Sequence, residues 1–150
     1  MSFADEFLTE KKDISLCLAK KIAGAVRLEA EKLSVKAVTA VYNSGARPVL
    51  VEVMDGAFIA SFDIASGKAY TSAALKMPTK VLKNLAQPGS DLYGVQNTNS
   101  GKIVVFGGGE PLVYKGCCVG AVGVSGGTED EDTYLAEVAA RTFAEAAKNE

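Results

Sequence analysis

The sequence predicts an α+β fold, in which helices pack against a five-stranded antiparallel sheet. The expected order of elements is helix, two strands, helices, three strands and a final helix. Neighbouring strands are expected to be antiparallel, because the loops between them are too short for the crossovers that parallel strands need. The helices are expected to pack on the sheet, because this buries the apolar faces of the helices and of the sheet. A chain of 150 residues, 48% of them hydrophobic, can bury one core, and neither an internal repeat nor a linker divides it. Residues 1–150 are therefore expected to form a single domain.

The first helix and the hairpin after it are predicted from periodicity and turn chemistry. Apolar residues recur about every fourth position over residues 13–33, which is the spacing of an amphipathic helix, and Asp13 is a suitable N-cap. Residues 35–42 are rich in β-branched side chains and lead into a turn at residues 43–45. Residues 48–54 then form the returning strand of a β-hairpin.

The middle of the chain carries small residues at helical spacing. Residues 57–75 are rich in alanine and serine, which predicts one or two helices that pack closely on the sheet through these small side chains. Pro78 ends this segment and starts a short helix that reaches Leu85. The sequence Gln-Pro-Gly-Ser at residues 87–90 indicates a loop.

Three strands and a helix make up the C-terminal part. Residues 103–106 and 112–114 are predicted strands separated by a glycine-rich loop, and a Lys-Gly turn leads to a third strand over residues 117–125. Residues 129–148 have apolar side chains at helical spacing. The helix is expected to start with a capping box, because residues 128–131 are Thr-Glu-Asp-Glu.

The composition excludes several kinds of site. The chain has no histidine, which excludes a Ser-His-Asp or Cys-His mechanism, a histidine-bound zinc and a histidine-ligated haem iron. Its cysteines are Cys17, Cys117 and Cys118, and their spacing fits neither a disulfide framework nor a zinc site. We interpret them as reduced, small hydrophobic residues, and we predict no metal site.

Charge and hydropathy narrow the range of partners. The net charge is -2 and the 16 basic residues are scattered, whereas nucleic-acid binders gather lysine and arginine on one face. No apolar run approaches the roughly 20 residues that span a bilayer, and the first residues are acidic and polar, unlike those of a secretory signal. We therefore expect a cytoplasmic protein that binds neither nucleic acid nor membranes.

Two glycine-rich loops are candidate ligand sites. The backbone N–H groups of residues 107–109 are able to approach a carboxylate or phosphate without obstruction by side chains. Residues 125–128 lie between a strand and a helix, where free N–H groups favour an anion. The alternative for both loops is a tight turn, and the acidic residues 129–132 oppose an anion at the second. Neither loop has the lysine of a P-loop or the βαβ context of a dinucleotide site, so ATP and NAD are not expected.

Polar residues at element ends complete the predicted site. Met54 and Asp55 end a strand, Lys68 and Tyr70 lie on the middle helix, and Glu110 follows the three glycines. The alternative for Lys68 and Tyr70 is a solvated lysine and a half-buried tyrosine. The predicted ligand-binding residues are Met54, Asp55, Lys68, Tyr70, Gly107, Gly108, Gly109, Glu110, Ser125, Gly126, Gly127 and Thr128.

Five segments carry a resemblance to a known protein family. They occur in the expected order over nearly the whole chain. They are residues 54–57, 63–71, 87–89, 106–112 and 119–128, and Asp132 follows the last of them. In these segments the chain resembles the GlcG/HbpS family of haem-binding and haem-degrading-like proteins. It is most similar in type to cytoplasmic members, such as the C-terminal domain of PduO-type cobalamin adenosyltransferases and the stand-alone relatives of diol and glycerol dehydratase systems.

The resemblance implies a fold, an assembly and a class of ligand. The family fold is a profilin-like antiparallel sheet flanked by helices, and its members assemble from dimers into larger rings, often octamers. Some relatives hold haem iron through a histidine, which this sequence lacks. Haem or a corrinoid would then bind through another residue, such as Met54, Met77, a tyrosine, a cysteine or a hydroxyl, or by burial of the macrocycle alone.

Three functions are open at this point. The first is a cytoplasmic module that binds haem or a corrinoid, is accessory to cobalamin-dependent diol or glycerol metabolism, and is not itself an enzyme. The second is an enzyme or accessory factor for glycolate, a diol or an aldehyde, in which Lys68 and the glycine-loop amides hold an anion and Asp55 or Glu110 acts as a base. The third is an oligomeric structural protein without a ligand, because an alanine-rich surface suits subunit packing.

Overall fold

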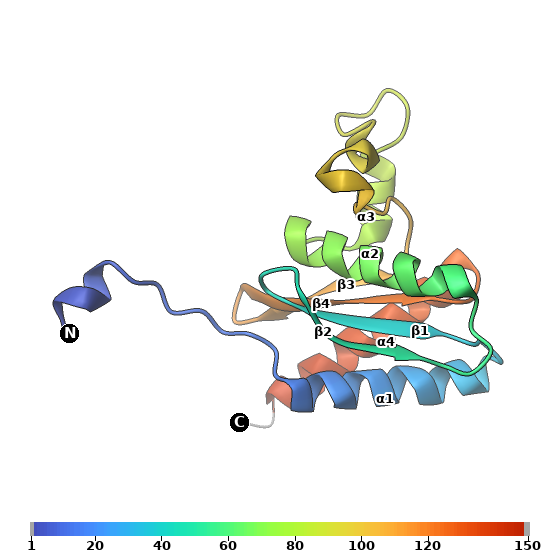
Figure 1. The fold of residues 1–150 in the computed structure, drawn as a ribbon, viewed down its shortest axis with the longest axis horizontal. Coiled ribbons are helices and arrows are strands. Elements are labelled where there is room, and N and C mark those ends of the chain that lie inside the picture. The colour runs from blue at the N-terminus through green and yellow to red at the C-terminus, as the bar shows by residue number, and fades with distance from the viewer. Residues whose placement is uncertain (1, 149–150) are drawn as a thin grey trace.

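The computed structural model describes residues 2–148, and its elements follow the predicted order except for one strand (Figure 1). The main helices and strands are α1 (Leu16–Lys32), β1 (Val38–Asn43), β2 (Pro48–Val53), α2 (Ile59–Leu75), α3 (Thr79–Leu85), β3 (Gly109–Tyr114), β4 (Cys117–Ser125) and α4 (Glu129–Lys148). Short 3-10 helices lie at η1 (Phe3–Glu6), η2 (Val95–Asn97) and η3 (Asn99–Gly101). Within the described range, no helix combines the length and the hydropathy that a membrane span requires.

The sheet corrects the predicted number of strands. In the described part of the chain it has four strands in the order β2-β1-β4-β3, and every neighbouring pair is antiparallel. The expectation of five strands is wrong because residues 103–106 do not join the sheet. The Val104 N–H instead donates to Thr71 Oγ1 on α2 at 2.9 Å. A side chain therefore satisfies this backbone group, which a strand would pair with its neighbour.

Helices cover both faces of the sheet. α2 lies on one face, while α1 and α4 lie side by side on the other (Figure 1). α2 approaches the strands closely, since a Cβ added at Gly123 of β4 would lie 2.1 Å from the Ala65 carbonyl oxygen. The predicted packing through small side chains is confirmed, with one helix over this segment.

The outer side of α2 is apolar at its start. Phe58, Ile59 and Phe62 are 72%, 97% and 48% exposed, although they are among the largest apolar side chains of the helix region. The helix therefore buries small residues and leaves large ones in solvent, which is the reverse of an ordinary amphipathic helix.

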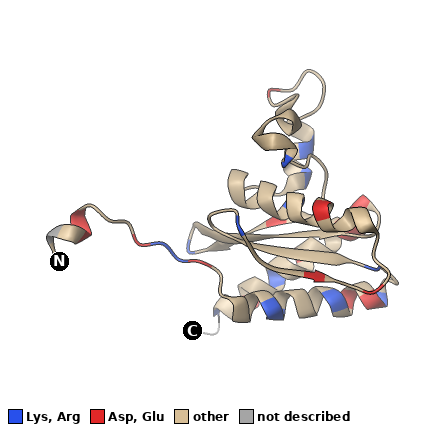
Figure 2. Ribbon diagram, in the orientation of Figure 1, with Lys and Arg blue, Asp and Glu red and all other residues tan. Residues whose placement is uncertain are grey.

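Helices α1 and α4 differ in how their starts compare with the prediction. Ser15, and not Asp13, caps α1, because the Ser15 hydroxyl accepts a backbone N–H of the first turn. Asp13 instead accepts the Ser44 N–H at 2.6 Å. The capping box of α4 is confirmed, since Thr128 and Glu131 each accept the other's backbone N–H, at 3.2 and 3.0 Å. Lysine and arginine are spread over the N-terminal segment, α1 and α3, without gathering on one element (Figure 2).

Candidate functional site

The predicted ligand-binding residues do not come together in one site. Met54 and Asp55 line a cleft beside Arg27 at the end of β2, and the Met54 sulfur accepts the Ala37 N–H at 3.3 Å. Tyr70 lines a different cavity, between α2 and the β1–β2 hairpin. The glycine loops and Lys68 lie near the start of α4.

Lys68 forms a buried ion pair with Asp132. Its Nζ lies 3.0 Å from Asp132 Oδ2, donates to the Val124 carbonyl oxygen at 2.9 Å, and stands 5.1 Å from the centre of the Phe106 ring. Burial lowers the pKa of Lys68 and raises the pKa of Asp132, because each charged group loses its hydration. The interpretation of Lys68 as a solvated side chain is wrong, since it is 0% exposed and links α2 to α4.

Three glycine amides of the two loops already have partners within the protein. The N–H of Gly107 donates to Glu129 Oε1 at 2.9 Å, that of Gly109 to Thr79 Oγ1 at 2.9 Å, and that of Gly127 to Asp132 Oδ1 at 2.8 Å. Hydrogen bonds to Lys83 and to this Gly107 amide lower the pKa of the Glu129 carboxyl. In the structure, the Gly107 and Gly127 amides therefore hold the first turn of α4, and the Gly109 amide holds the start of α3, rather than a free anion.

Gly108 shows why a glycine is needed in the first loop. Its φ is +118°, and a Cβ there would lie 2.6 Å from Lys68 Nζ and 2.8 Å from the Val124 carbonyl oxygen. The loop thus closes directly over the buried ion pair, and any side chain at this position would displace the ammonium group.

A cavity of about 330 Å³ opens beside these loops, and we call it the glycine cavity. Its lining includes Phe58, Ile64, Phe106, Ser125, Gly126, Gly127, Glu129 and Asp132. The Ser125 hydroxyl is buried and donates to the Ser61 hydroxyl at 3.3 Å. Two carboxylates on the wall oppose an anionic ligand, so the glycine cavity suits an apolar group better than a phosphate.

Glu110 lies apart from the glycine cavity. It is half-buried on β3, and burial raises the pKa of its carboxyl, although the nearby positive charge of Lys80 opposes that rise. Asp55 and Glu110, the two predicted bases, therefore belong to different parts of the surface.

A cavity that is larger than the glycine cavity lies at the turn between β3 and β4, and the sequence did not indicate it. It has a volume of about 710 Å³, and residues before α1 and at the end of α2 complete it. We call it the thiol cavity, and it is lined by Glu10, Lys11, Lys12, Lys76, Tyr114, Lys115, Gly116, Cys117 and Cys118.

The thiol cavity combines positive charge, an aromatic ring and two thiols. Its four lysines make no ion pair with a carboxylate within residues 2–148. The ammonium groups of Lys12 and Lys115 lie 5.0 and 5.1 Å from the centre of the Tyr114 ring. Cys117 is an exposed free cysteine, and the half-buried Cys118 donates its thiol to the Gly120 carbonyl oxygen at 3.2 Å. These groups are suited to an anionic ligand with an aromatic plane, or with a metal that accepts sulfur.

Comparison with known proteins assigns the family. The family described as "Haem degrading protein HbpS-like" matches residues 14–141, which is most of the chain. The chain belongs to the HbpS-like family. The resemblance found in the sequence segments is thereby confirmed.

Relatives of this HbpS-like chain are known in sequence and in structure. An uncharacterised 15.0 kDa protein from the dhaT-dhaS intergenic region of Citrobacter freundii is 46% identical over 132 residues, which covers 88% of this chain and 93% of the relative. The corrinoid adenosyltransferase PduO of the same organism is 34% identical over 119 residues, covering 79% of this chain but only 36% of PduO. The crystal structure of a PduOC–heme complex superposes with a TM-score of 0.84 at 31% identity, and the match covers 87% of this chain and 94% of that chain.

Proposed function

We propose that this HbpS-like chain is a tetrapyrrole-binding module, and that it takes haem in the thiol cavity. The observation that carries the proposal is a cavity of about 710 Å³ that is lined by a tyrosine, two thiols and four lysines, none of which has a carboxylate partner among residues 2–148. A haem presents an apolar plane, two propionates on one edge and an iron that takes an axial ligand. The thiol cavity has a counterpart for each of these, and the heme complex of PduOC supports this class of ligand.

The axial ligand is assigned by exclusion within the thiol cavity. Cysteine thiolate and tyrosine phenolate both ligate haem iron in proteins, so the lack of histidine does not prevent binding. The Tyr114 ring is contacted by two ammonium groups, and the Cys118 thiol is hydrogen bonded. Cys117 is exposed, and its thiol has no hydrogen bond within the described residues. We therefore assign Cys117 as the iron ligand; haem bound there would supply a redox-active iron.

Titration with hemin tests the assignment. Wild-type protein is expected to give a saturable change of the Soret band at one haem per chain, while Cys117→Ser should shift the band and raise the Kd by about tenfold or more, a loss of roughly 1.4 kcal/mol. Cys17→Ser, an exposed cysteine on α1, is the matched control and should behave like wild type. The Phe106→Ala variant reports on the glycine cavity instead. The proposed site is wrong if wild type does not saturate, or if Phe106→Ala weakens binding and Cys117→Ser does not.

A corrinoid is the second candidate ligand, because PduO is named as a corrinoid adenosyltransferase. With a corrinoid as its ligand, the chain would act as a cytoplasmic accessory protein of cobalamin-dependent diol or glycerol metabolism. Corrinoids carry amide side chains where haem carries carboxylates. Replacing Lys11 and Lys115 by glutamine should therefore weaken haem binding but leave cob(II)alamin binding unchanged, so titration with both compounds distinguishes the two ligands.

We also propose that the chain assembles into a homo-oligomer. The exposed side chains of Phe58, Ile59 and Phe62 form an apolar face at the start of α2 that supports self-association of this single domain, from dimers toward an octamer. Light scattering after size-exclusion chromatography should show a multiple of the 15.6 kDa chain mass. Ile59→Glu should reduce that mass, whereas a wild-type monomer would contradict the assembly.

A further inference from the structure

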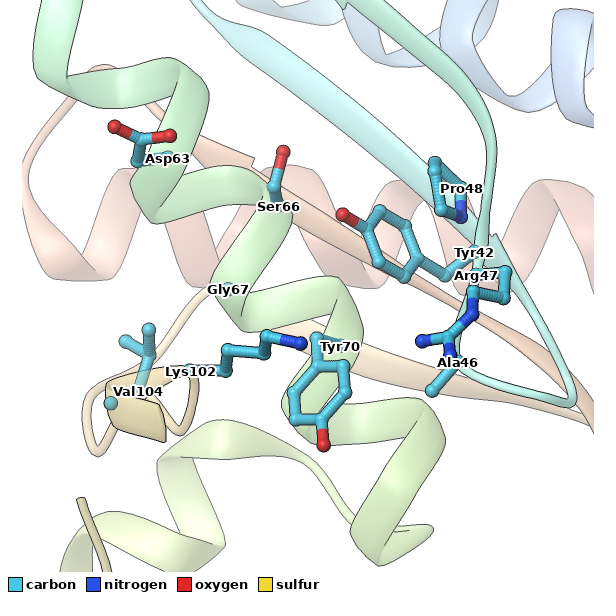
Figure 3. A pocket seen from close by; sticks show the side chains of 11 residues that line it. Tyr42, Ala46, Arg47, Pro48, Asp63, Ser66, Gly67, Tyr70, Lys102 and Val104 are labelled. Carbon is cyan, nitrogen blue, oxygen red and sulfur yellow. The ribbon is translucent and has the colours of Figure 1, made fainter. Parts of the chain in front are cut away.

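A separate cavity lies between the β1–β2 hairpin, α2 and residues 101–104 (Figure 3). We call it the tyrosine cavity. It has a volume of about 370 Å³, and its polar side chains are those of Tyr42, Arg47, Asp63, Ser66, Tyr70 and Lys102. It shares no lining residue with the thiol cavity, so a ligand here is independent of the proposed tetrapyrrole site.

Two cations enter the tyrosine cavity from opposite walls. Arg47 extends from the hairpin and Lys102 from the loop before β3, and the Tyr70 ring lies between them (Figure 3). Lys102 Nζ is 5.4 Å from the centre of that ring. In the described part of the chain, neither cation forms an ion pair with a carboxylate. Two unpaired cations that face one cavity favour an oxyanion, which accepts charge-assisted hydrogen bonds from both.

The other end of the cavity carries groups that bind a hydroxyl. Ser66 Oγ is buried and has no hydrogen-bond partner among the described residues. The Tyr42 hydroxyl points toward Ser66, and Asp63 lies at the end remote from Arg47 (Figure 3). A buried hydroxyl without a partner is costly, so a ligand group that bonds to Ser66 would remove that cost.

The walls of the tyrosine cavity are held in place by hydrogen bonds. Thr71 Oγ1 accepts the Val104 N–H at 2.9 Å and donates to the Gly67 carbonyl oxygen at 2.7 Å, which fixes the loop that carries Lys102 against α2. A Cβ at Gly67 would lie 2.7 Å from the Val104 side chain, so this close approach needs glycine.

The aromatic and hairpin walls are fixed in the same way. Tyr70 Oη accepts a hydrogen bond from Asn99 Nδ2 at 3.0 Å. In the hairpin, Asn43 Oδ1 accepts the Arg47 N–H at 3.1 Å. A site whose walls are ordered before binding loses less conformational entropy when a ligand arrives.

We infer that the tyrosine cavity binds a small organic oxyanion that also carries a hydroxyl group. Arg47 and Lys102 hold the carboxylate or phosphate, and Ser66 and Asp63 hold the hydroxyl. The volume lies within the range of small-molecule sites in proteins. Hydroxy carboxylates and phosphate monoesters share this chemistry, and the experiment separates them.

Isothermal titration calorimetry with four probes tests the inference. Lactate represents the hydroxy carboxylates and glycerol 3-phosphate the phosphate monoesters, while glycerol and inorganic phosphate each present only one half of the recognised chemistry. At low salt we expect saturable binding of lactate or glycerol 3-phosphate, little binding of glycerol, and weaker binding of inorganic phosphate. Whichever of the first two binds more tightly identifies the oxyanion.

Substitutions place the binding in the cavity. Arg47→Gln and Lys102→Gln should each raise the Kd about tenfold, and Ser66→Ala should weaken the hydroxylated probe but not inorganic phosphate. Lys21→Gln, an exposed cation on α1, is the matched control and should not change the Kd. The substituted cations are exposed, so the circular dichroism and Tm of these variants should match wild type.

Three results would overturn the inference. The first is that neither lactate nor glycerol 3-phosphate binds wild type at millimolar concentration. The second is an unchanged Kd in both Arg47→Gln and Lys102→Gln. The third applies if glycerol 3-phosphate binds more tightly than lactate, and it is equal affinity for inorganic phosphate and glycerol 3-phosphate, which would remove the role of the hydroxyl group.

Discussion

Replacing Lys68 by methionine tests whether the buried ion pair holds α2 against α4. The substitution keeps the length of the side chain but removes the Nζ bonds to Asp132 at 3.0 Å and to the Val124 carbonyl oxygen at 2.9 Å. Asp132 remains buried, with the Gly127 N–H still donating to it. Removal of one partner from a buried pair costs about 3–5 kcal/mol. With a typical urea dependence, the denaturation midpoint should fall by about 2 M.

The loss in Lys68→Met should depend on pH. Burial already raises the pKa of Asp132 above its ordinary value of 3.8, and the positive charge of Lys68 opposes that rise. Without Lys68 the pKa rises further. When the pKa of a group is higher in the folded state than in the unfolded state, the folded state binds a proton more tightly. Protonation of Asp132 therefore stabilises the fold at low pH, and this contribution is lost as the pH rises through the pKa of Asp132 in the folded state. The deficit of the variant should therefore be smaller near pH 4 than at about pH 7.

Urea titrations followed by far-UV circular dichroism at both pH values measure these effects. Lys80→Met is the matched control, because Lys80 pairs with Glu137 at the surface, and it should cost less than about 1 kcal/mol. The double variant Lys68→Met/Asp132→Leu should be more stable than Lys68→Met alone, since no charge stays buried without a partner. A loss below about 1 kcal/mol in Lys68→Met, or an equal loss at both pH values, would refute the reasoning.

Three further predictions concern the same scaffold. Gly108→Ala should destabilise the fold by more than about 2 kcal/mol, because the added Cβ would meet Lys68 Nζ. Gly101 also has a positive φ but no neighbour within 4 Å of an added Cβ, so Gly101→Ala should cost about 1 kcal/mol. Equal losses of stability in urea titrations would contradict this prediction. Burial raises the pKa of the Glu110 carboxyl, so the protonated carboxyl stabilises the fold at acidic pH and this stabilisation is lost as the pH rises. Glu110→Gln should therefore raise the Tm at neutral pH and leave it unchanged at acidic pH. A lower Tm at neutral pH would count against it. Thr128→Ala removes one half of the capping box of α4 and should cost about 1 kcal/mol in urea titrations, so an unchanged midpoint would argue that the cap adds nothing.

Local patterns predicted most of the elements correctly. The capping box at Thr128 and the periodicity of α4 depend on residues only three or four positions apart, and both are confirmed. Residues 103–106 have the β-branched character of a strand, but a short apolar run does not reveal what its backbone will pair with. Here the partner is the hydroxyl of Thr71, more than thirty positions earlier.

The candidate sites were harder to predict than the fold. Lys68 looked like a surface residue because its partner, Asp132, is 64 positions away and the ion pair forms only when α2 and α4 are in place. The glycine loops were recognised as special positions, but nothing in the sequence showed that Glu129, Thr79 and Asp132 would occupy their amides. The thiol cavity joins residues 10–12 to residues 114–118, and no spacing or motif in the sequence relates these two distant segments.

The sequence by itself determined the family, the α+β class, the helices and the absence of any histidine ligand. These properties depend on residue types and on short spacings, which any conformation of the chain retains. The tertiary structure decided that the sheet has four strands in the described residues, that Lys68 is buried, and that Arg47 and Lys102 face one cavity. Each of these results depends on contacts between distant segments, and such contacts exist only after the backbone has paid the entropy of bringing them together.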